Sequence, residues 1–197
     1  MDTKTLPPDL GITTVKEIMD TKTLPPDLQN TIRFHGHLCP GLLIGYRAAK
    51  AALEKLGVTR SEDEELVAVV ENQSCSVDAL QVLCGCTFGK GNLFFLDYGK
   101  QVFTIGSRKS GKAVRIALRG DLVKPTGPNG RTDREKFIEQ LLKDPLESLY
   151  RVSEPPFEFP AEAQIFPTLV CSRCGEGVME TRTVTRDGRI YCIPCVR

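Results

Sequence analysis

The chain has 197 residues, of which 41% are hydrophobic and 26% charged, so it is long enough for one ordinary core and a small appendage. Its 26 basic and 25 acidic residues nearly cancel, which excludes a bulk attraction to nucleic acid or to an anionic membrane. No apolar run approaches the roughly 20 residues that span a bilayer, and the N-terminus lacks the apolar segment of a signal peptide. We therefore expect a cytoplasmic protein, in which the eight cysteines are metal ligands or reactive thiols rather than disulfides.

The N-terminal segment contains one decapeptide twice, MDTKTLPPDL at residues 1–10 and again at 19–28. Two copies are too few for a repeat fold, because such folds need several units to bury a shared core. The Pro-Pro pairs favour extended backbone before them. We expect residues 1–22 to be a tail without a catalytic role, and a core domain to occupy residues 23–150.

The first candidate site lies in segment 34–41 (FHGHLCPG), which brings both histidines of the chain, His35 and His37, next to Cys39. Neutral imidazole and thiolate together suit zinc or a neighbouring soft transition metal. The alternative is that these residues only pack in the core, since a free cysteine is often a small buried hydrophobe.

The elements that flank this segment are predicted to be helices, over residues 27–34 and 42–56, the second of which ends at Gly57. Pro40 suits a first helical turn. Cys39 then lies at a helix N-terminus, where unpaired N–H groups and the helix dipole favour a thiolate.

Three more thiols, Cys75, Cys84 and Cys86, follow in the same domain and could complete a His/Cys pocket. The β-branched run at 66–70 predicts a buried strand, and a helix capped by Ser74 or Ser76 is expected over 77–83. Cys75 is therefore also expected close to a helix N-terminus.

Three strands are expected next, over residues 93–97, 101–106 and 113–119, with hairpin-like links. In the last of them apolar and polar residues alternate, which assigns one face to the core and leaves a basic face solvated.

The glycine-rich segment 85–91 (GCTFGKG) is not a phosphate-binding P-loop, because its spacing is one residue short and Gly91 replaces the required hydroxyl. Its glycines instead let the backbone pass close to the pocket. Lys90 and Asn92 are then weak candidates for cofactor contacts or for contacts with a partner chain.

Five motifs in this order resemble the FmdE family of formylmethanofuran dehydrogenase subunits over about residues 28–120: segments 34–41, 71–79, 85–92, 97–100 and 111–115. The resemblance implies an α+β, thioredoxin-like core with a mixed β-sheet flanked by helices, an active site that holds zinc, and operon association with a molybdenum or tungsten formylmethanofuran dehydrogenase. Carried over to this sequence, it assigns the site to His37, Cys39 and Cys75, which are also the candidate catalytic residues, with His35 and Cys86 as further metal ligands. Cys84 departs from the family's pattern and either adds a ligand or fills space. The resemblance supplies no reaction.

The second half of the chain begins with a helix expected over 132–143, capped by Thr132 with Glu135 three residues on. Residues 151–170 are rich in proline and phenylalanine and are expected to be an extended linker whose aromatic side chains anchor on a neighbouring surface. Because one small core cannot cover this apolar surface, we expect a homodimer.

The C-terminal segment 171–197 carries two C-x2-C pairs, at Cys171/Cys174 and Cys192/Cys195. Four thiolates at this spacing close a tetrahedral structural zinc site, for which a rubredoxin-like iron site is the alternative. Asp187-Gly188 predicts a hairpin turn between the pairs. The segment resembles a treble-clef zinc finger, with its final helix cut short.

Three functions remain open. The first is a metal-binding accessory protein of a molybdenum or tungsten oxidoreductase, with zinc in the tail and zinc or another transition metal in the core. The second is an independent thiol-redox or zinc-dependent enzyme. The third and weakest is a nucleic-acid-binding zinc protein, since the basic residues of the tail are offset by acidic ones and few aromatic residues lie among them.

Overall fold

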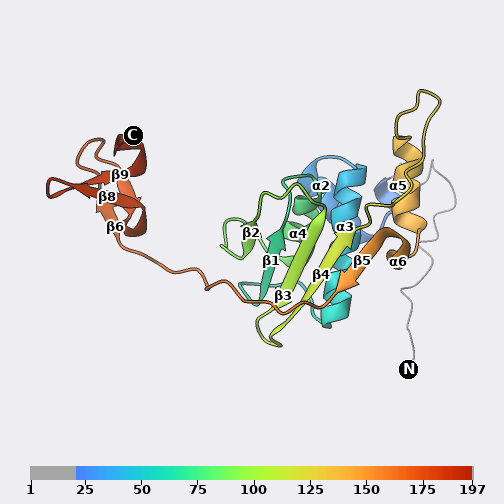
Figure 1. Ribbon diagram of the computed structural model, residues 1–197, viewed down its shortest axis with the longest axis horizontal. Helices are drawn as coiled ribbons and strands as arrows, with labels where there is room; N and C mark the ends of the chain where they lie inside the picture. The colour runs from blue at the N-terminus through green and yellow to red at the C-terminus, as the bar shows by residue number, and fades with distance from the viewer. Residues whose placement is uncertain (1–20, 197) are drawn as a thin grey trace. The chain divides into compact units, whose positions relative to one another are not determined.

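The computed structural model describes residues 21–196, which form two compact units that divide between Glu162 and Ala163 (Figure 1). The first decapeptide copy lies outside these residues. The second copy belongs to the fold, because its Leu24 and Leu28 are buried in the core.

The first unit is built on a five-stranded sheet with strand order β2-β1-β3-β4-β5. Strands β1 and β2 run parallel, and every other neighbouring pair is antiparallel, so the sheet is mixed as expected. The strands are β1 (Leu66–Val70), β2 (Leu93–Phe95), β3 (Val102–Ser107), β4 (Lys112–Leu118) and β5 (Tyr150–Ser153). Strand β5 carries the sheet to Ser153, into the segment that the sequence pattern assigns to the linker.

Helices pack on one face of the sheet and on one another, with α3 against β3, β4, α4 and α5, and α2 against α3 and α4. They are α2 (Pro26–His35), α3 (Pro40–Leu56), α4 (Ser76–Cys84), α5 (Arg134–Lys143) and the short α6 (Leu146–Leu149), preceded by a 3-10 turn, η1 (Thr21–Thr23). Side chains from both layers, such as Leu43, Leu80, Phe103 and Ile116, fill the core between them.

Helices α3 and α4 approach each other closely at Gly45. A Cβ built at Gly45 would lie 2.0 Å from the carbonyl oxygen of Ser76, so any side chain there would push the two helices apart. Glycine inside a helix costs up to about 1 kcal/mol relative to alanine. The close contact that it permits holds the N-terminal ends of α3 and α4 side by side.

The opposite face of the sheet is covered by the segment that follows β5. Gly106 of β3 pairs with the fully buried Val67 of β1, and both point away from the helices. Phe157 and Phe159 lie over this position as an edge-to-face pair, 2.9 and 2.8 Å from a Cβ built at Gly106. Arg108 stacks on the Phe159 ring, as expected for a linker anchored by its aromatic side chains. We call residues 155–162 the strap; it crosses the lower ends of the strands (Figure 1).

Two predicted helix caps were wrong. Helix α5 is capped by Asp133, whose carboxylate accepts a hydrogen bond from Lys136 N, because Thr132 is held in a β-bridge with Thr126. Helix α4 has Cys75 at its N-cap position without a side-chain cap bond, because the hydroxyls of Ser74 and Ser76 bond to each other.

The second unit consists of two hairpins and a final short helix. The hairpins pair β6 (Thr168–Val170) with β7 (Gly177–Met179), and β8 (Thr183–Arg186) with β9 (Arg189–Cys192); the 3-10 turn η2 (Glu180–Arg182) joins them and α7 (Ile193–Val196) ends the unit. The predicted Asp187-Gly188 turn is confirmed, since both residues have the positive φ angles, 49° and 71°, that a tight two-residue hairpin requires.

Candidate metal centres

The first unit contains a group of three metal-type ligands at the N-terminal ends of α3 and α4. The ring of His35 and the sulfurs of Cys39 and Cys75 lie within 4.8 Å of one another. His35 Nε2 is 3.7 Å from Cys39 Sγ. We call these three residues the core group.

Local backbone features position each member of the core group. His35 is the last residue of α2, which ends at Gly36 in a left-handed conformation with φ 100°. Cys39 is the N-cap of α3, as predicted, and its sulfur accepts a hydrogen bond from Leu42 N at 3.3 Å. Gly41 leaves space beside both thiols, because a Cβ there would lie 3.1 Å from Cys75 Cβ and within 4 Å of both sulfurs.

Asp78 orients the His35 ring. Its Oδ2 lies 2.7 Å from His35 Nδ1, and since a carboxylate only accepts hydrogen bonds, Nδ1 must carry the proton. The Nε2 lone pair is then free and faces the two thiols. A carboxylate that accepts from the second nitrogen of a metal-binding histidine is a recurring feature of zinc sites.

The chemistry of the core group fits a cation such as zinc. Burial, and then the neighbouring Cys39 sulfur, raise the pKa of the Cys75 thiol, so in the absence of a cation this thiol stays protonated at neutral pH. A bound divalent cation would offset this effect and would be held by one imidazole and two thiolates. Three protein ligands leave one tetrahedral position open.

The other residues proposed for this site lie outside the core group. His37 is exposed, with its ring 4.7 Å from that of His35. Cys84 and Cys86 are fully buried. Asn92 is also buried and its amide donates to the carbonyl oxygens of Asp63 and Leu66, while the Lys90 ammonium donates to carbonyl oxygens of the same loop. Both side chains therefore brace a loop.

Sequence reasoning missed Asp78. A carboxylate in the first turn of a predicted helix is common and favourable in itself, so its type and place gave no sign of a role beside histidine. The available signal was its position three residues after Cys75, which places it within one helical turn of a candidate ligand.

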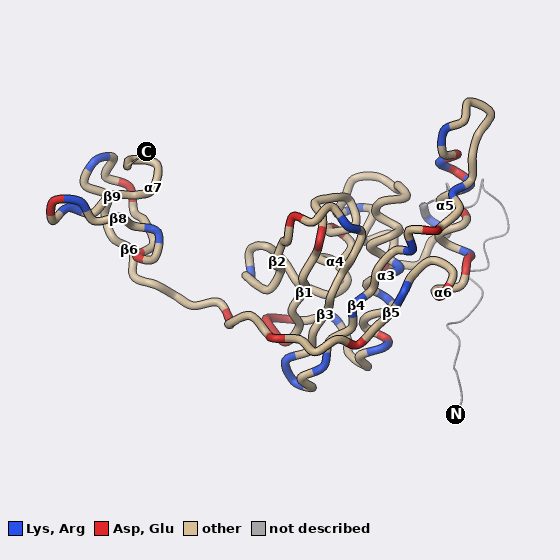
Figure 2. Tube along the Cα trace, in the orientation of Figure 1, with Lys and Arg blue, Asp and Glu red and all other residues tan. Residues whose placement is uncertain are grey.

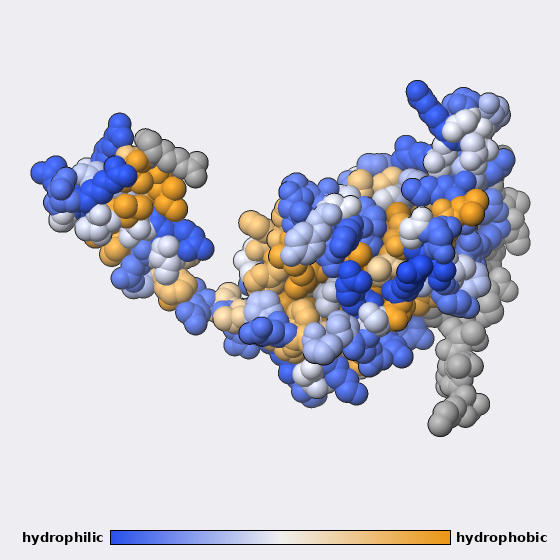
Figure 3. All heavy atoms as spheres, in the orientation of Figure 1, coloured by the Kyte–Doolittle hydropathy of each residue, from blue (hydrophilic) through white to orange (hydrophobic). Residues whose placement is uncertain are grey.

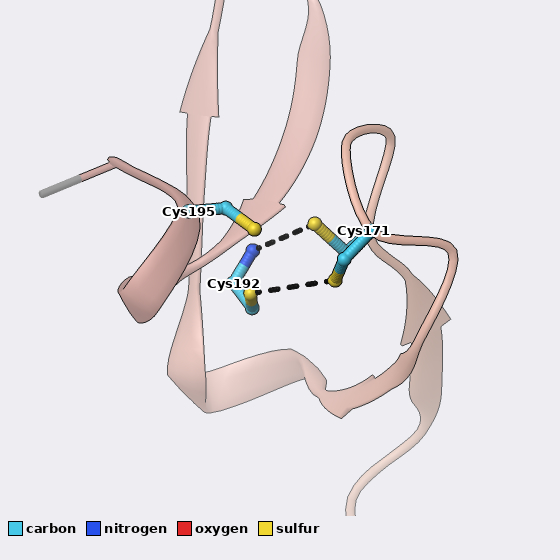
Figure 4. Close-up of side chains that lie close together, drawn as sticks. Cys171, Cys192 and Cys195 are labelled. Atoms are coloured by element: carbon cyan, nitrogen blue, oxygen red, sulfur yellow. Dashed lines mark hydrogen bonds between the residues drawn. The ribbon is translucent and has the colours of Figure 1, made fainter.

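The second unit contains the four-cysteine group, Cys171, Cys174, Cys192 and Cys195, whose sulfurs all lie within 4.8 Å of one another. Figure 4 shows Cys171, Cys192 and Cys195 pointing toward a common centre. The N–H groups of Cys174 and Cys192 donate to Cys171 Sγ and lower the pKa of this thiol to about 6. The sulfur of Cys192, together with the other neighbouring thiols, raises the pKa of Cys195 to about 12. Four converging sulfurs, with one predisposed to ionise, fit a closed tetrahedral zinc site.

The surface of the second unit carries charges of both signs. Lys and Arg residues alternate with Asp and Glu residues along the chain from β6 onward (Figure 2). This unit therefore presents no extended basic stripe among the described residues, which is the feature expected of a nucleic-acid-binding module. None of the helices between residues 21 and 196 has the length and apolar character needed to cross a membrane.

Together these features define a class: a metal-binding α+β domain followed by a four-cysteine zinc finger. Comparison with known proteins agrees with both parts. Residues 34–154 match the FmdE family, described as "molybdenum formylmethanofuran dehydrogenase operon", and residues 164–196 match the prokaryotic dksA/traR C4-type zinc finger. The chain belongs to the FmdE family, which confirms the resemblance seen in the sequence.

A solved structure and a curated protein are similar to this chain. The crystal structure of an FmdE-like protein of tungsten formylmethanofuran dehydrogenase, from Syntrophus aciditrophicus, shares the fold, with a TM-score of 0.64, 20% identity and coverage of 95% of each chain. A probable S-adenosyl-L-methionine-binding protein of Archaeoglobus fulgidus is 33% identical over 187 residues, which cover 82% of this chain and 50% of that protein. The chain thus spans about half the length of this relative.

Proposed function

We propose that this protein is a metal-binding accessory subunit of a molybdenum or tungsten oxidoreductase of the formylmethanofuran dehydrogenase type. In this proposal the four-cysteine group holds a structural zinc, and the core group holds a second, exchangeable zinc or related ion. Family membership and the names of the similar proteins support the choice of partner. The geometry of His35, Cys39 and Cys75 supports the second metal.

The observation that carries the proposal is the orientation of His35. An imidazole that only packed in the core would need no carboxylate on Nδ1 while its Nε2 faces two thiols. This arrangement presents three donors toward one point and leaves a fourth position free. Structural zinc sites are closed by four protein ligands, whereas sites that exchange metal or bind substrate keep a position open.

The adjacent histidines provide a matched pair of variants to test the second metal. We expect fully loaded protein to hold two zinc ions per chain, and mild chelation to remove one. His35→Ala should retain only the zinc of the tail, because the core group loses a ligand. His37→Ala removes an exposed imidazole outside the core group and should retain both ions. Metal analysis of anaerobically purified protein distinguishes these results; equal loading of the two variants would contradict the proposed ligand set.

The partner is tested by capture. Tagged protein should retain subunits of a molybdenum or tungsten oxidoreductase from an extract of its own host, and removal of residues 163–197 should weaken this retention if the zinc finger is the docking element. Retention of no such subunit, with both metals bound, would contradict the accessory role.

A second candidate is an independent zinc-dependent enzyme, favoured by the open position of the core group and the space at Gly41 beside both thiols. Turnover of a small substrate by zinc-loaded protein alone, lost in His35→Ala and retained in His37→Ala, would favour this candidate. A thiol-redox role is less favoured, because the raised pKa of Cys75 opposes formation of a nucleophilic thiolate in the metal-free protein.

A further inference from the structure

A cavity of about 240 Å³ lies next to the core group and belongs to none of the sites described above. Its apolar wall consists of Val70, Val77, Phe88, Leu93 and Phe95. Asp78, whose carboxylate holds His35, also lines it. The cavity and the core group therefore share one side chain.

The cavity occupies a place where the fold favours ligand binding. Val70 and Phe95 are the last residues of β1 and β2, the parallel pair of the sheet, and α4 forms the crossover between these two strands. In sheets with parallel strands, ligands bind in the crevice beyond the carboxyl ends of those strands. The turn after β1 and the first turn of α4 close the crevice here, since Ser74 and Val77 line it.

The charge of the cavity distinguishes between possible ligands. Among the described residues that line it, Asp78 is the one with an ionisable side chain, and this side chain is 34% exposed. The N–H groups of Val77 and Asp78 at the start of α4 already donate to the carbonyl oxygens of Ser74 and Cys75. The cavity thus offers a partly desolvated carboxylate without a cationic donor, so it favours a cation over an anion.

The aromatic wall points to the shape of that cation. Phe88 is 84% exposed and Phe95 is 48% exposed, an unusual degree of exposure for two neighbouring phenylalanines. Figure 3 shows apolar residues gathered over β2, the edge strand from which Phe95 comes. A flat apolar group placed against these rings would remove apolar surface from water, and aromatic faces also attract a nearby cation.

We propose that this cavity binds a small organic cation made of a flat apolar ring and an ammonium group. The ring lies against Phe88 and Phe95, and the ammonium group pairs with the Asp78 carboxylate. Asp78 has acceptor capacity for this contact, because a carboxylate offers about four lone-pair positions and His35 occupies one. The proposal goes beyond the proposed function and requires no metal, but it places the ligand directly beside the core group.

Three probes of matched size test the charge preference: benzylammonium, benzyl alcohol and benzoate. Titrations of the full-length protein followed by NMR should give a dissociation constant for benzylammonium about tenfold lower than for benzyl alcohol, as expected for one partly desolvated charge-assisted contact. Benzoate should bind more weakly than both. The order should be the same before and after removal of the exchangeable metal.

Variants locate the binding. Asp78→Asn should reduce the preference for benzylammonium over benzyl alcohol to less than about threefold, because the amide keeps the shape and loses the charge. Phe88→Leu should weaken all three probes without change in zinc content. Tyr98→Leu is its matched control, an exposed aromatic residue that follows the same strand and does not line the cavity, and it should bind the probes like the wild type.

Three results would overturn the proposal: equal affinity for the three probes, an unchanged preference in Asp78→Asn, or equal effects of Phe88→Leu and Tyr98→Leu. Failure of all probes to bind would also overturn it, because the cavity would then be closed or filled in solution. None of these results depends on whether the core group holds zinc, so they leave the proposed function to be judged by its own test.

Discussion

The two groups of metal-type ligands in this protein are assembled in different ways. The four-cysteine group draws all of its ligands from residues 171–195, on two short hairpins, and closes a tetrahedral site by itself. The core group draws on residues 35–75, from the ends of different helices, and has three ligands. The first can be recognised from spacing along the chain, whereas the second exists only because α3 and α4 pack tightly at Gly45.

The largest effect is expected in the tail. Cys171→Ser should remove the tail zinc and unfold residues 163–196, because in so small a module metal binding and folding are coupled, with apparent binding free energies of about 10–16 kcal/mol. The core should keep its own fold. Zinc analysis and limited proteolysis measure both, with Ser172→Ala as the control inside the same turn. Unchanged metal content in Cys171→Ser would contradict the assignment of a structural zinc.

In the core the metal should depend on a residue that does not bind it. Asp78→Asn should lower the affinity of the core group for zinc by about ten- to a hundredfold, since an amide accepts less strongly from His35 Nδ1 and no longer enforces its tautomer. Tail zinc should be unaffected. Competition with a coloured chelator measures this affinity, and Asp121→Asn, an exposed carboxylate paired with Arg119, is the control. Equal affinities of these two variants would show that Asp78 does not act through His35.

The strap tests where the first unit ends. Gly106→Val should destabilise the core by about 1–3 kcal/mol, because a side chain there meets the rings of Phe157 and Phe159. The displaced strap should be cleaved faster by protease than in the wild type, while the finger stays folded. Gly120→Ala serves as control, since nothing lies within 4 Å of its Cβ position. Wild-type stability and cleavage in Gly106→Val would show that the strap is not packed on the sheet.

The smallest effect distinguishes buried thiols from ligand thiols. Burial raises the pKa of Cys86 from 9.0 to about 12, so its folded form favours the neutral thiol, and the stability that this contributes is complete below pH 9. As pH rises from 9 toward 12, the unfolded chain ionises first and that stability is lost, by about 1.4 kcal/mol at pH 10. Urea unfolding at pH 8, 9 and 10 should therefore show a shallower alkaline loss in Cys86→Ala. A parallel loss in both proteins would contradict the inert, buried role of Cys86.

Much of the fold follows from local patterns. The β-branched run at Leu66–Val70, the helix stop at Gly57 and the tight turn at Asp187 lie where the sequence places them, because each depends on a few neighbouring residues. Strand β5 was not expected, since four residues without clear alternation become a strand only by pairing with β4. Thr132 lost its predicted capping role to a bridge that no local rule reveals.

The core group was predictable only in part. Segment 34–41 identified the neighbourhood, and the helix N-terminus at Cys39 followed from Pro40. Which histidine faces the thiols depends on Gly36, whose left-handed turn ends α2 directly after His35 and leaves His37 outside on an exposed loop. Homodimer formation, a cytoplasmic location and a thioredoxin-like relationship stay predictions.

The strap also has a consequence for synthesis of the protein. Phe157 and Phe159 leave the ribosome after every strand of the sheet, so the face around Val67 and Gly106 stays bare until the last residues of the first unit emerge. A nascent chain that ends at residue 154, where the family match stops, has all five strands and lacks their cover. Such a chain exposes an apolar sheet face, the kind of surface that chaperones hold and that aggregates when unprotected.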